Sequence, residues 1–316
     1  MVESILNDEM LIRMFNRKPI DIPIVAITGG KGGTGKTSIA VNLAFSLSGK
    51  GRHLLLIDVD VDSPTAGLIL GIKPKLIQEV KAFTPRIVKM RCDKCGKCVE
   101  ACRAHALIRV KGKYPILFED LCSGCEACLL VCPKNAIENG GKVIGYIYYD
   151  KTDDLDFIGG ELKPNEARSA QVVSATKSFA FEQVKQGNYE LMIVDTPPGT
   201  HCNVVQGLRG ADLALAVTEP TPLGIHDLSL ILELTAKLGI QTKVVINRAN
   251  MPGGCRDDLN EILDHYKTEV ISEVPLDKKL FQSYISGTPI VVMDPDSLAT
   301  KAILKIVEFI LDYIEK

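Results

Sequence analysis

The chain has 316 residues, of which 46% are hydrophobic and 24% charged, and its formal net charge is −2. This composition predicts a well-packed globular protein, long enough for one large and one small domain. The charge gives no reason to expect a nucleic acid or a charged membrane as partner, and no apolar run is long enough to predict a membrane span. Because the N-terminus lacks the basic-then-apolar layout of a secretory signal, we expect a cytoplasmic location.

Residues 1–19 precede the first apolar run of strand length. They carry apolar side chains at Ile5, Leu6, Met10 and Leu11, among polar and charged residues. Such a stretch is typical of an amphipathic helix. We therefore expect an additional N-terminal helix outside the main sheet.

Apolar runs of strand length alternate with stretches of helical periodicity along most of the chain. The expected strands are 24–28, 53–58, 191–195, 213–217, 243–247 and 270–274. The expected helices are 36–49, 171–186, 225–238 and 257–266. This alternation predicts an α/β fold with a mainly parallel sheet and helices on both faces.

Residues 86–146 interrupt the alternation, because they hold eight cysteines and no long regular element. The remainder has an ordinary size for one α/β domain. We therefore expect a nucleotide-binding domain formed by 20–85 and 147–316, with 86–146 as a small domain inserted into one of its loops.

A glycine-rich loop follows the first expected strand. It reads Gly30, Lys31, Gly32, Gly33, Thr34, Gly35, Lys36 and Thr37, with Ser38 opening the next helix. Strand, loop and helix together fit the pattern G-x-x-x-x-G-K-[ST] of a phosphate-binding loop. The glycines allow backbone N–H groups to surround the phosphates of ATP or ADP. Lys36 is expected to reach the β- and γ-phosphate oxygens, and the Thr37 hydroxyl to bind Mg²⁺.

Carboxylates stand at the ends of two expected strands, where an α/β sheet places its chemistry. Asp58, Asp60 and Asp62 end or follow the strand 53–58, and Asp62 fits a turn residue equally well. Asp195 ends the strand 191–195 and precedes the sequence Thr-Pro-Pro-Gly. We expect Asp195 to hold the Mg²⁺ ion and its water shell, and Thr-Pro-Pro-Gly to sense the γ-phosphate.

Eight of the ten cysteines form two runs with the spacing C-x₂-C-x₂-C-x₃-C, as in bacterial ferredoxins. In such proteins the first three cysteines of one run bind a [4Fe–4S] cluster, and the fourth binds the other cluster. One cluster is then expected on Cys92, Cys95, Cys98 and Cys132. The other is expected on Cys122, Cys125, Cys128 and Cys102. Zinc is the weaker alternative, since zinc sites use pairs of C-x₂-C and not two interlocked sets of four.

The motifs and their order resemble the MinD/ParA/Mrp/nitrogenase-iron-protein superfamily, whose ATPases have a deviant Walker A motif. The resemblance rests on the lysine inside the glycine run, on the strand that ends at Asp195 with its Thr-Pro-Pro-Gly, and on their order along the chain. The inserted cysteines are similar to the branch that carries a two-[4Fe–4S] ferredoxin domain. This resemblance implies that Lys31 reaches across an ATP-dependent homodimer to the partner's nucleotide, and that Asp60 orients the attacking water.

The same resemblance implies roles for the later segments of the chain. Asn247 matches the position that reads the adenine edge, and Pro275 and Asp277 belong to the segment that packs over the base. Cys202 lies just past the Thr-Pro-Pro-Gly, where the nitrogenase iron protein places a ligand of a cluster shared by two subunits. Here Cys202 either does the same or is a buried thiol. The C-x-x-C near the C-terminus of Mrp-type carriers is missing.

Three functions fit these patterns. The preferred hypothesis is an ATP-hydrolysing protein that couples a nucleotide-driven dimerisation cycle to electron transfer through two [4Fe–4S] clusters, toward an unidentified redox partner. The first alternative is an ATPase that assembles or carries clusters for a client protein. The second is a MinD-type spatial-organising ATPase with structural or redox-sensing clusters. Complete sets of four cysteines favour electron transfer, because a cluster donor should be labile and incompletely ligated.

Two further expectations concern the ends of elements. The apolar spacing over 303–314 predicts a final helix that covers the sheet, with a membrane-binding helix as the alternative. The cysteine insertion follows Asp62 and ends before Asp195. We therefore expect both of its ends to lie beside the elements that move on hydrolysis, so that the nucleotide controls the redox behaviour of the clusters.

Overall fold

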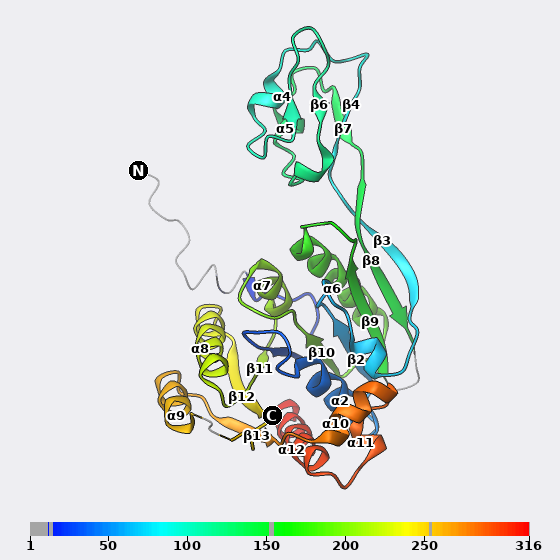
Figure 1. The fold of residues 1–316 in the computed structure, drawn as a ribbon. Helices are drawn as coiled ribbons and strands as arrows, with labels where there is room; N and C mark the ends of the chain where they lie inside the picture. The colour runs from blue at the N-terminus through cyan, green and yellow to red at the C-terminus, as the bar shows by residue number, and fades with distance from the viewer. Residues whose placement is uncertain (1–11, 13–14, 152–154, 253–254, 316) are drawn as a thin grey trace.

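The computed structural model describes residues 12, 15–151, 155–252 and 255–315. Most of the helix expected over 1–19 lies outside these residues. The described residues form a nine-stranded sheet with the order β13-β12-β11-β1-β10-β2-β9-β8-β3. A small cysteine-containing unit projects beyond the β3 and β8 end of this sheet (Figure 1).

The six strands expected from the sequence form the parallel part of the sheet. They are β1 (Ile24–Thr28), β2 (Leu54–Asp58), β10 (Leu191–Asp195), β11 (Leu213–Thr218), β12 (Gln241–Asn247) and β13 (Val270–Val274). Where they are neighbours they pair in parallel, and β1, β2, β10 and β11 are buried along their whole length. Such continuous burial is typical of parallel strands that are covered on both faces. The predicted α/β fold is confirmed.

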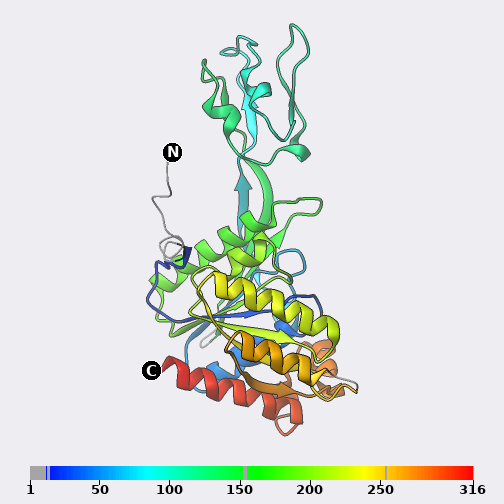
Figure 2. The ribbon, with the colours of Figure 1, turned by 90° about the vertical axis from the view of Figure 1, so that its left-hand side faces the viewer.

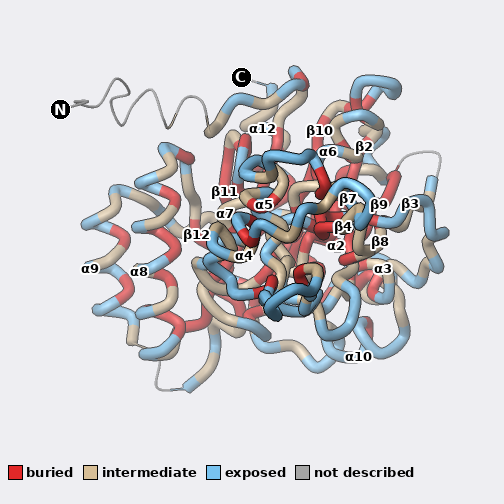
Figure 3. The backbone as a smooth tube through the Cα atoms, turned by 90° about the horizontal axis from the view of Figure 1, so that it is seen from above, coloured by how far each residue is buried: buried red, intermediate tan, exposed pale blue. Residues whose placement is uncertain are grey.

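Helices cover the two faces of the sheet. Successive strand residues point to opposite faces, so Val25 and Ile27 pack on one side, and Ile24 and Ala26 on the other. The first face is covered by α2 (Lys36–Ser48) and α12 (Leu298–Ile314), and the second by α6 (Ser169–Gln186) and α7 (Cys202–Leu208). The helices α8 (Pro222–Lys237) and α9 (Arg256–His265) lie over β11 and β12. Figure 3 shows that the buried residues are concentrated in the strands and on the helix faces that pack against them. The shorter helices are α3 (Ala66–Ile69), α10 (Lys278–Ser286) and α11 (Ile290–Met293).

The final helix α12 covers the sheet, as expected. Its residues Ile303, Ile306, Val307 and Ile310 are fully buried, and the helix packs against β13 and α2. The apolar face is therefore occupied within the protein. Within the described ranges, no helix combines the length and the apolar character that crossing a bilayer requires.

Three strands of the sheet were not expected from the sequence. They are β9 (Leu155–Leu162), which is parallel to β2, and β8 (Lys142–Asp150) and β3 (Lys75–Ala82), which complete an antiparallel edge. In β9 two adjacent glycines interrupt the apolar pattern, and Gly160 is needed because a Cβ atom there would lie 2.4 Å from the Thr176 hydroxyl oxygen. In β3 only Val80 and Ala82 are buried, since it is the edge strand.

The position of the two ends of the insertion was predicted wrongly. We expected them beside the carboxylates that follow β2, but β3 and β8 lie at the sheet edge, and β9 separates β8 from β2. The sequence could not show this, because β9 follows the insertion in the chain and pairs with β2 in space. The two chain ends of the insertion therefore do not lie directly beside the carboxylates that follow β2.

The cysteine-containing unit consists of two short strand pairs and short helices. β4 (Pro85–Ile87) pairs with β7 (Ile137–Asn139), and β5 (Leu107–Ile108) pairs with β6 (Ile116–Leu117). The helices are α4 (Lys97–Glu100), α5 (Ala127–Leu130) and the 3₁₀ turn η1 (Glu119–Leu121). The expected boundary at 146 falls inside β8, and Figure 2 shows that β3 and β8 alone connect the unit to the sheet.

The unit is an internal repeat. Cys92 to Cys102 and Cys122 to Cys132 each run through an extended loop into a short helix, α4 or α5. Left-handed backbone recurs at equivalent places: Lys94 and Gly124, Gly96 and Glu126, and His105 and Asn135. These positions let each loop curl tightly, so that its cysteine thiols face a common centre.

Candidate functional site

The phosphate-binding loop lies between β1 and α2. Gly33 and Gly35 have φ values of 80° and 93°, which favour glycine. A side chain at Gly35 would also collide with Asn247, whose Nδ2 atom would lie 2.2 Å from its Cβ. Asn247 donates a hydrogen bond to the Thr34 carbonyl oxygen at 2.8 Å, and Lys36 Nζ donates to the Lys31 carbonyl oxygen at 3.0 Å. The loop is therefore held in shape from both sides, with the N-terminus of α2 open toward a cavity.

A cavity of about 990 Å³ lies in front of this loop. The expected residues that line it are Gly32, Gly33, Gly35, Lys36, Thr37, Ser38, Asp60, Asn247, Pro275 and Asp277. Its walls also include Asp62, Pro197 and Pro198, which the sequence analysis had named, and Leu276, which lies between Pro275 and Asp277. The residues that the sequence analysis missed are Ser63, Thr65, Ile69, Asn203, Arg248 and the α10 residues Lys278, Leu280, Phe281, Gln282 and Tyr284. Asp277 caps the N-terminus of α10 by accepting a hydrogen bond from the Lys279 N–H at 2.8 Å. An aspartate is a preferred N-cap residue, so Asp277 could have predicted that a helix starts here. Gly30, Lys31, Thr34 and Asp195 do not line the cavity.

Two aspartates lie side by side at the ends of β2 and β10. Asp58 and Asp195 are in register across this strand pair, and both are fully buried. Asp58 accepts hydrogen bonds from three backbone N–H groups, of Asp60, Thr65 and Ala66, so its carboxylate shapes the loop after β2. Both carboxylate oxygens of Asp195 are buried and have no hydrogen-bond partner among the described residues.

The charges at this site are strongly perturbed. Burial raises the pKa of Asp195 well above its usual value, and the neighbouring Asp58 adds to the rise. Burial likewise raises the pKa of Asp58 to about 7 and that of Asp60 to about 6, whereas it lowers the pKa of Lys36. Buried carboxylates without hydrogen-bond donors are costly unless a cation compensates them. The donor set of Asp195, Asp60 and the Thr37 hydroxyl therefore fits Mg²⁺, which prefers oxygen ligands.

The segment after Asp195 contacts the end of β1 and Gly29, the residue that leads into the phosphate-binding loop. The Thr196 N–H donates to the Ile27 carbonyl oxygen at 3.1 Å, and the Gly199 N–H donates to the Gly29 carbonyl oxygen at 3.1 Å. Pro197 and Pro198 line the cavity, and α7 begins shortly after Gly199. A change in the loop can therefore reach α7 through this segment.

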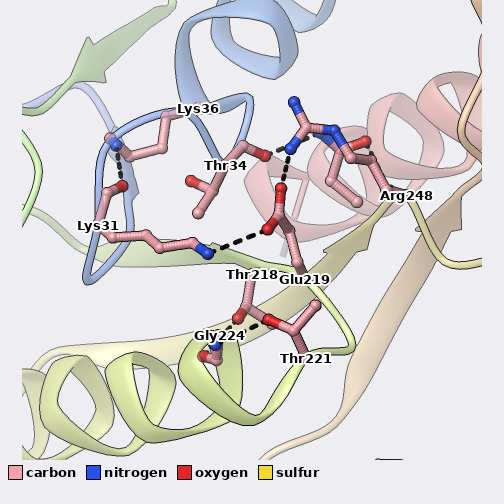
Figure 4. Close-up of polar contacts among 9 residues, drawn as sticks. Lys31, Thr34, Lys36, Thr218, Glu219, Thr221, Gly224 and Arg248 are labelled. Carbon is pink, nitrogen blue, oxygen red and sulfur yellow. Dashed lines mark hydrogen bonds and ion pairs between the residues drawn. The ribbon is translucent and has the colours of Figure 1, made fainter. Parts of the chain in front are cut away.

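Lys31 does not line the cavity, and its side chain pairs with Glu219 (Figure 4). Its Nζ atom lies 3.1 Å from Glu219 Oε2, and Arg248 donates to the other carboxylate oxygen. The Glu219 side chain is only 6% exposed and follows β11, just before Thr221 caps α8 by accepting from the Gly224 N–H at 3.0 Å. The sequence analysis assigned no role to Glu219 or Arg248, because their pairing depends on segments that are distant in the chain.

The eight cysteines of the repeat gather around two small cavities. One is lined by Cys102, Cys122, Cys125 and Cys128, and the other by Cys92, Cys95, Cys98 and Cys132. These are the two expected sets, each with three cysteines from one half of the repeat and one from the other half. All ten cysteines are free thiols.

The chemistry of each set fits an iron–sulfur cluster. Burial raises the pKa of the Cys128 thiol to about 11 and also raises that of Cys98, so deprotonation there needs a bound cation. The Ala136 N–H already donates to Cys132 Sγ at 3.2 Å, a contact that stabilises a thiolate. Among the described residues, no group of three or more His, Cys, Asp or Glu side chains is arranged to hold a metal ion. A [4Fe–4S] cluster instead needs four thiolates spaced around a cube of iron and sulfide.

Comparison with known proteins places this chain in a family. Residues 25–290 match the CobQ/CobB/MinD/ParA nucleotide binding domain. The chain belongs to this nucleotide-binding family. An uncharacterized protein of Methanocaldococcus jannaschii is 37% identical over 84% of this chain and 91% of its own length. An iron-sulfur cluster carrier protein of Aquifex aeolicus is 24% identical over 96% of this chain and 71% of its own length. The MinD cell division protein of Aquifex aeolicus has the same fold, with a TM-score of 0.58 and 21% identity over 92% of this chain and 97% of that one.

Membership of the MinD/ParA family confirms the resemblance inferred from the sequence. It supports nucleotide binding by this chain. We expect the nucleotide in the cavity in front of Gly30–Thr37, because this loop has the sequence pattern that binds phosphates. Asn247, Pro275 and Asp277 lie in the wall of that cavity, which Asp60 and Pro197 also line.

Cys202 is neither in a cysteine cavity nor buried. It is exposed in the first turn of α7, so the expectation of a buried thiol was wrong. The reason is that the segment after Gly199 runs over the surface before α7 packs its Val204 and Leu208 against the sheet.

Proposed function

We propose that this protein hydrolyses ATP at the Gly30–Thr37 loop and couples the nucleotide cycle to electron transfer through two [4Fe–4S] clusters. The observation that carries the proposal is the pair of cysteine cavities, each with four thiols, on the same chain as a nucleotide site. When bound, the clusters accept and release single electrons. Complete ligation by four cysteines favours permanent clusters, as an electron carrier requires.

The residues of the nucleotide site have different roles in ATP hydrolysis. The backbone N–H groups of the loop and Lys36 hold the phosphates and balance the charge that develops during phosphoryl transfer. Thr37 and Asp195 hold the magnesium ion. Asp60 lines the cavity beside them, and its pKa of about 6 leaves it mainly ionised at pH 7, as a residue that orients the attacking water should be.

We expect the protein, purified without oxygen, to hold about eight iron atoms per chain, since two cubane clusters need four each. Replacing Cys125 by serine should lower the iron content, because Cys125 lines one of the cysteine cavities. Cys202→Ser is the matched control and should keep all the iron. Iron analysis together with EPR spectra after dithionite reduction would decide. Stoichiometric zinc without an EPR signal would exclude the iron–sulfur proposal.

We also propose that ATP brings two chains together through Lys31. Lys31→Ala should leave ATP binding intact, since Lys31 does not line the cavity, and should abolish ATP-dependent dimerisation. Glu219→Gln should promote dimerisation, because it weakens the ion pair that retains Lys31 within its own subunit. Light scattering with ADP and with a non-hydrolysable ATP analogue measures both effects. A Lys31→Ala protein that dimerises normally would refute the role across the interface.

A second candidate function is the assembly or transfer of clusters. It is favoured by the Aquifex aeolicus relative, which is named an iron-sulfur cluster carrier protein and aligns with 96% of this chain. The exposed thiol of Cys202 beside the nucleotide-sensing segment would suit a transient ligand. The two candidates differ in one measurable respect. A carrier should lose iron to a ferrous chelator during ATP turnover, whereas an electron-transfer protein should keep it.

A further inference from the structure

One loop of the cysteine unit lies against the nucleotide-binding domain. This loop joins Cys122 to Cys125, and its Gly124 has left-handed backbone with φ of 75°. A Cβ atom at Gly124 would lie 3.3 Å from the Phe83 carbonyl oxygen and 3.6 Å from Arg168 Nη1. Arg168 is the N-cap residue of α6, on the nucleotide-binding domain. The loop is therefore enclosed between the base of the cysteine unit and the start of α6.

Arg168 is fixed in place there. Its Nε and Nη2 atoms donate to the two carboxylate oxygens of Glu166 at 2.8 Å and 2.7 Å, a bidentate pair. Lys142 of β8 lies 3.4 Å from the same carboxylate and donates to Asp120 of the cysteine unit at 3.2 Å. These charges join the cysteine unit, its connecting strand and the nucleotide-binding domain in one network.

The third nitrogen of the Arg168 guanidinium, Nη1, has no hydrogen-bond partner among the described residues. The Arg168 side chain is 9% exposed, and its Nη1 atom is buried without a hydrogen-bond acceptor in the described part of the chain. A buried guanidinium nitrogen without an acceptor is costly, and it requires a negative partner nearby. Glu166 is the carboxylate paired with Arg168, and the Cys122 thiolate is a second negative neighbour of this guanidinium.

The other half of the repeat has no such contact. The position equivalent to Gly124 is Lys94, whose side chain turns to the outer surface, where it donates to the Gly112 carbonyl oxygen at 3.0 Å and lies over the Tyr114 ring. The two cysteine sets thus have equal ligands but unequal surroundings. The Cys122 set adjoins a fixed, buried cation, whereas the cation beside the Cys92 set is exposed: Arg109 donates to the Cys95 carbonyl oxygen at 3.3 Å.

We propose that Arg168 is a positioning residue for the cluster of Cys102, Cys122, Cys125 and Cys128, and that its fixed charge gives this cluster the higher reduction potential of the two. The inference rests on the proposed electron-transfer function. Reduction adds a negative charge to a cluster that four thiolates already make negative, so a nearby buried cation stabilises the reduced form. Electrons would then pass from the Cys92 set, at the outer end, to the Cys122 set beside the nucleotide-binding domain.

The test is a redox titration, followed by EPR, of the anaerobic holoprotein and its variants. Arg168→Gln should lower the reduction constant of one cluster at least tenfold, which is about 59 mV for a one-electron couple, and leave the other unchanged. Arg168→Lys keeps the charge and should retain most of the difference. Arg86→Gln is the matched control, because Arg86 is an exposed arginine of the cysteine unit that pairs only with Glu138 among the described residues. It should shift neither cluster.

The outcomes separate this inference from the proposed function. A protein without two clusters contradicts the proposed function itself. Two clusters whose potentials are the same in wild type and Arg168→Gln overturn the inference alone. If Arg168→Gln fails to retain the second cluster, Arg168→Lys decides: retention with a wild-type potential supports the role of the charge, and loss of the cluster refutes it.

Discussion

Replacing Lys36 by alanine should abolish ATP hydrolysis and weaken ATP binding by about a hundredfold. The ammonium group lies in the cavity wall beside Asp60 and close to Asp195, where burial lowers its pKa and both carboxylates oppose that change. Phosphates of a bound nucleotide would keep it charged. Loss of a charge-assisted hydrogen bond in such a place costs about 3 kcal/mol, roughly two orders of magnitude in affinity.

Lys50→Ala provides the matched control, since Lys50 is an exposed lysine just beyond the C-terminus of the same helix, α2. It should bind and hydrolyse ATP like the wild type. Calorimetric titration with ATP measures affinity, phosphate release measures turnover, and circular dichroism checks folding. Equal affinity in Lys36→Ala and Lys50→Ala would show that the loop does not hold the phosphates.

The sequence predicted those parts of the fold that short patterns specify. Six strands were found because buried parallel strands read as continuous apolar runs, and the loop and cysteine residues because their chemistry fixes their spacing. β9, β8 and β3 were not predicted, because they lack a continuous apolar run. β9 contains a glycine pair, β8 has a bulged antiparallel pairing with β3, and β3 is exposed at the sheet edge. The roles of Glu219, Arg248 and Arg168 were not predicted for another reason. Their roles depend on which distant segments meet in space, and no local pattern records that.

The second large effect that we expect is control of the clusters by the nucleotide. Since the insertion ends at the sheet edge, away from β2, the coupling must pass through packed side chains. The segment after Asp195 contacts Gly29, directly before the phosphate-binding loop, through Gly199 and leads into α7. α7 packs against α6, and α6 begins at Arg168, beside the Cys122–Cys125 loop.

Lys177 is the central contact of this path. Its side chain is buried in α6, and its Nζ atom donates to the Gly207 carbonyl oxygen at 2.7 Å and the Arg209 carbonyl oxygen at 2.5 Å, at the end of α7. Burial lowers its pKa to about 7. Because the two carbonyl groups have few other donors within reach of a buried helix end, a movement of α7 should carry α6 with it.

We therefore expect the potential of the Cys122 cluster to differ between the nucleotide-free, ADP-bound and ATP-analogue-bound protein. An allosteric coupling of about 1–3 kcal/mol corresponds to a shift of about 40–130 mV for a one-electron couple. Lys177→Met should remove most of this shift while ATP still binds, since Lys177 lies outside the nucleotide cavity. Lys185→Gln, which changes an exposed lysine of the same helix paired with Glu182, should leave the shift intact.

Equal potentials in all three nucleotide states of the wild type would mean that the clusters do not respond to ATP, and the carrier function would then be the better account. A shift that survives in Lys177→Met would preserve the coupling but rule out the path through α7 and α6.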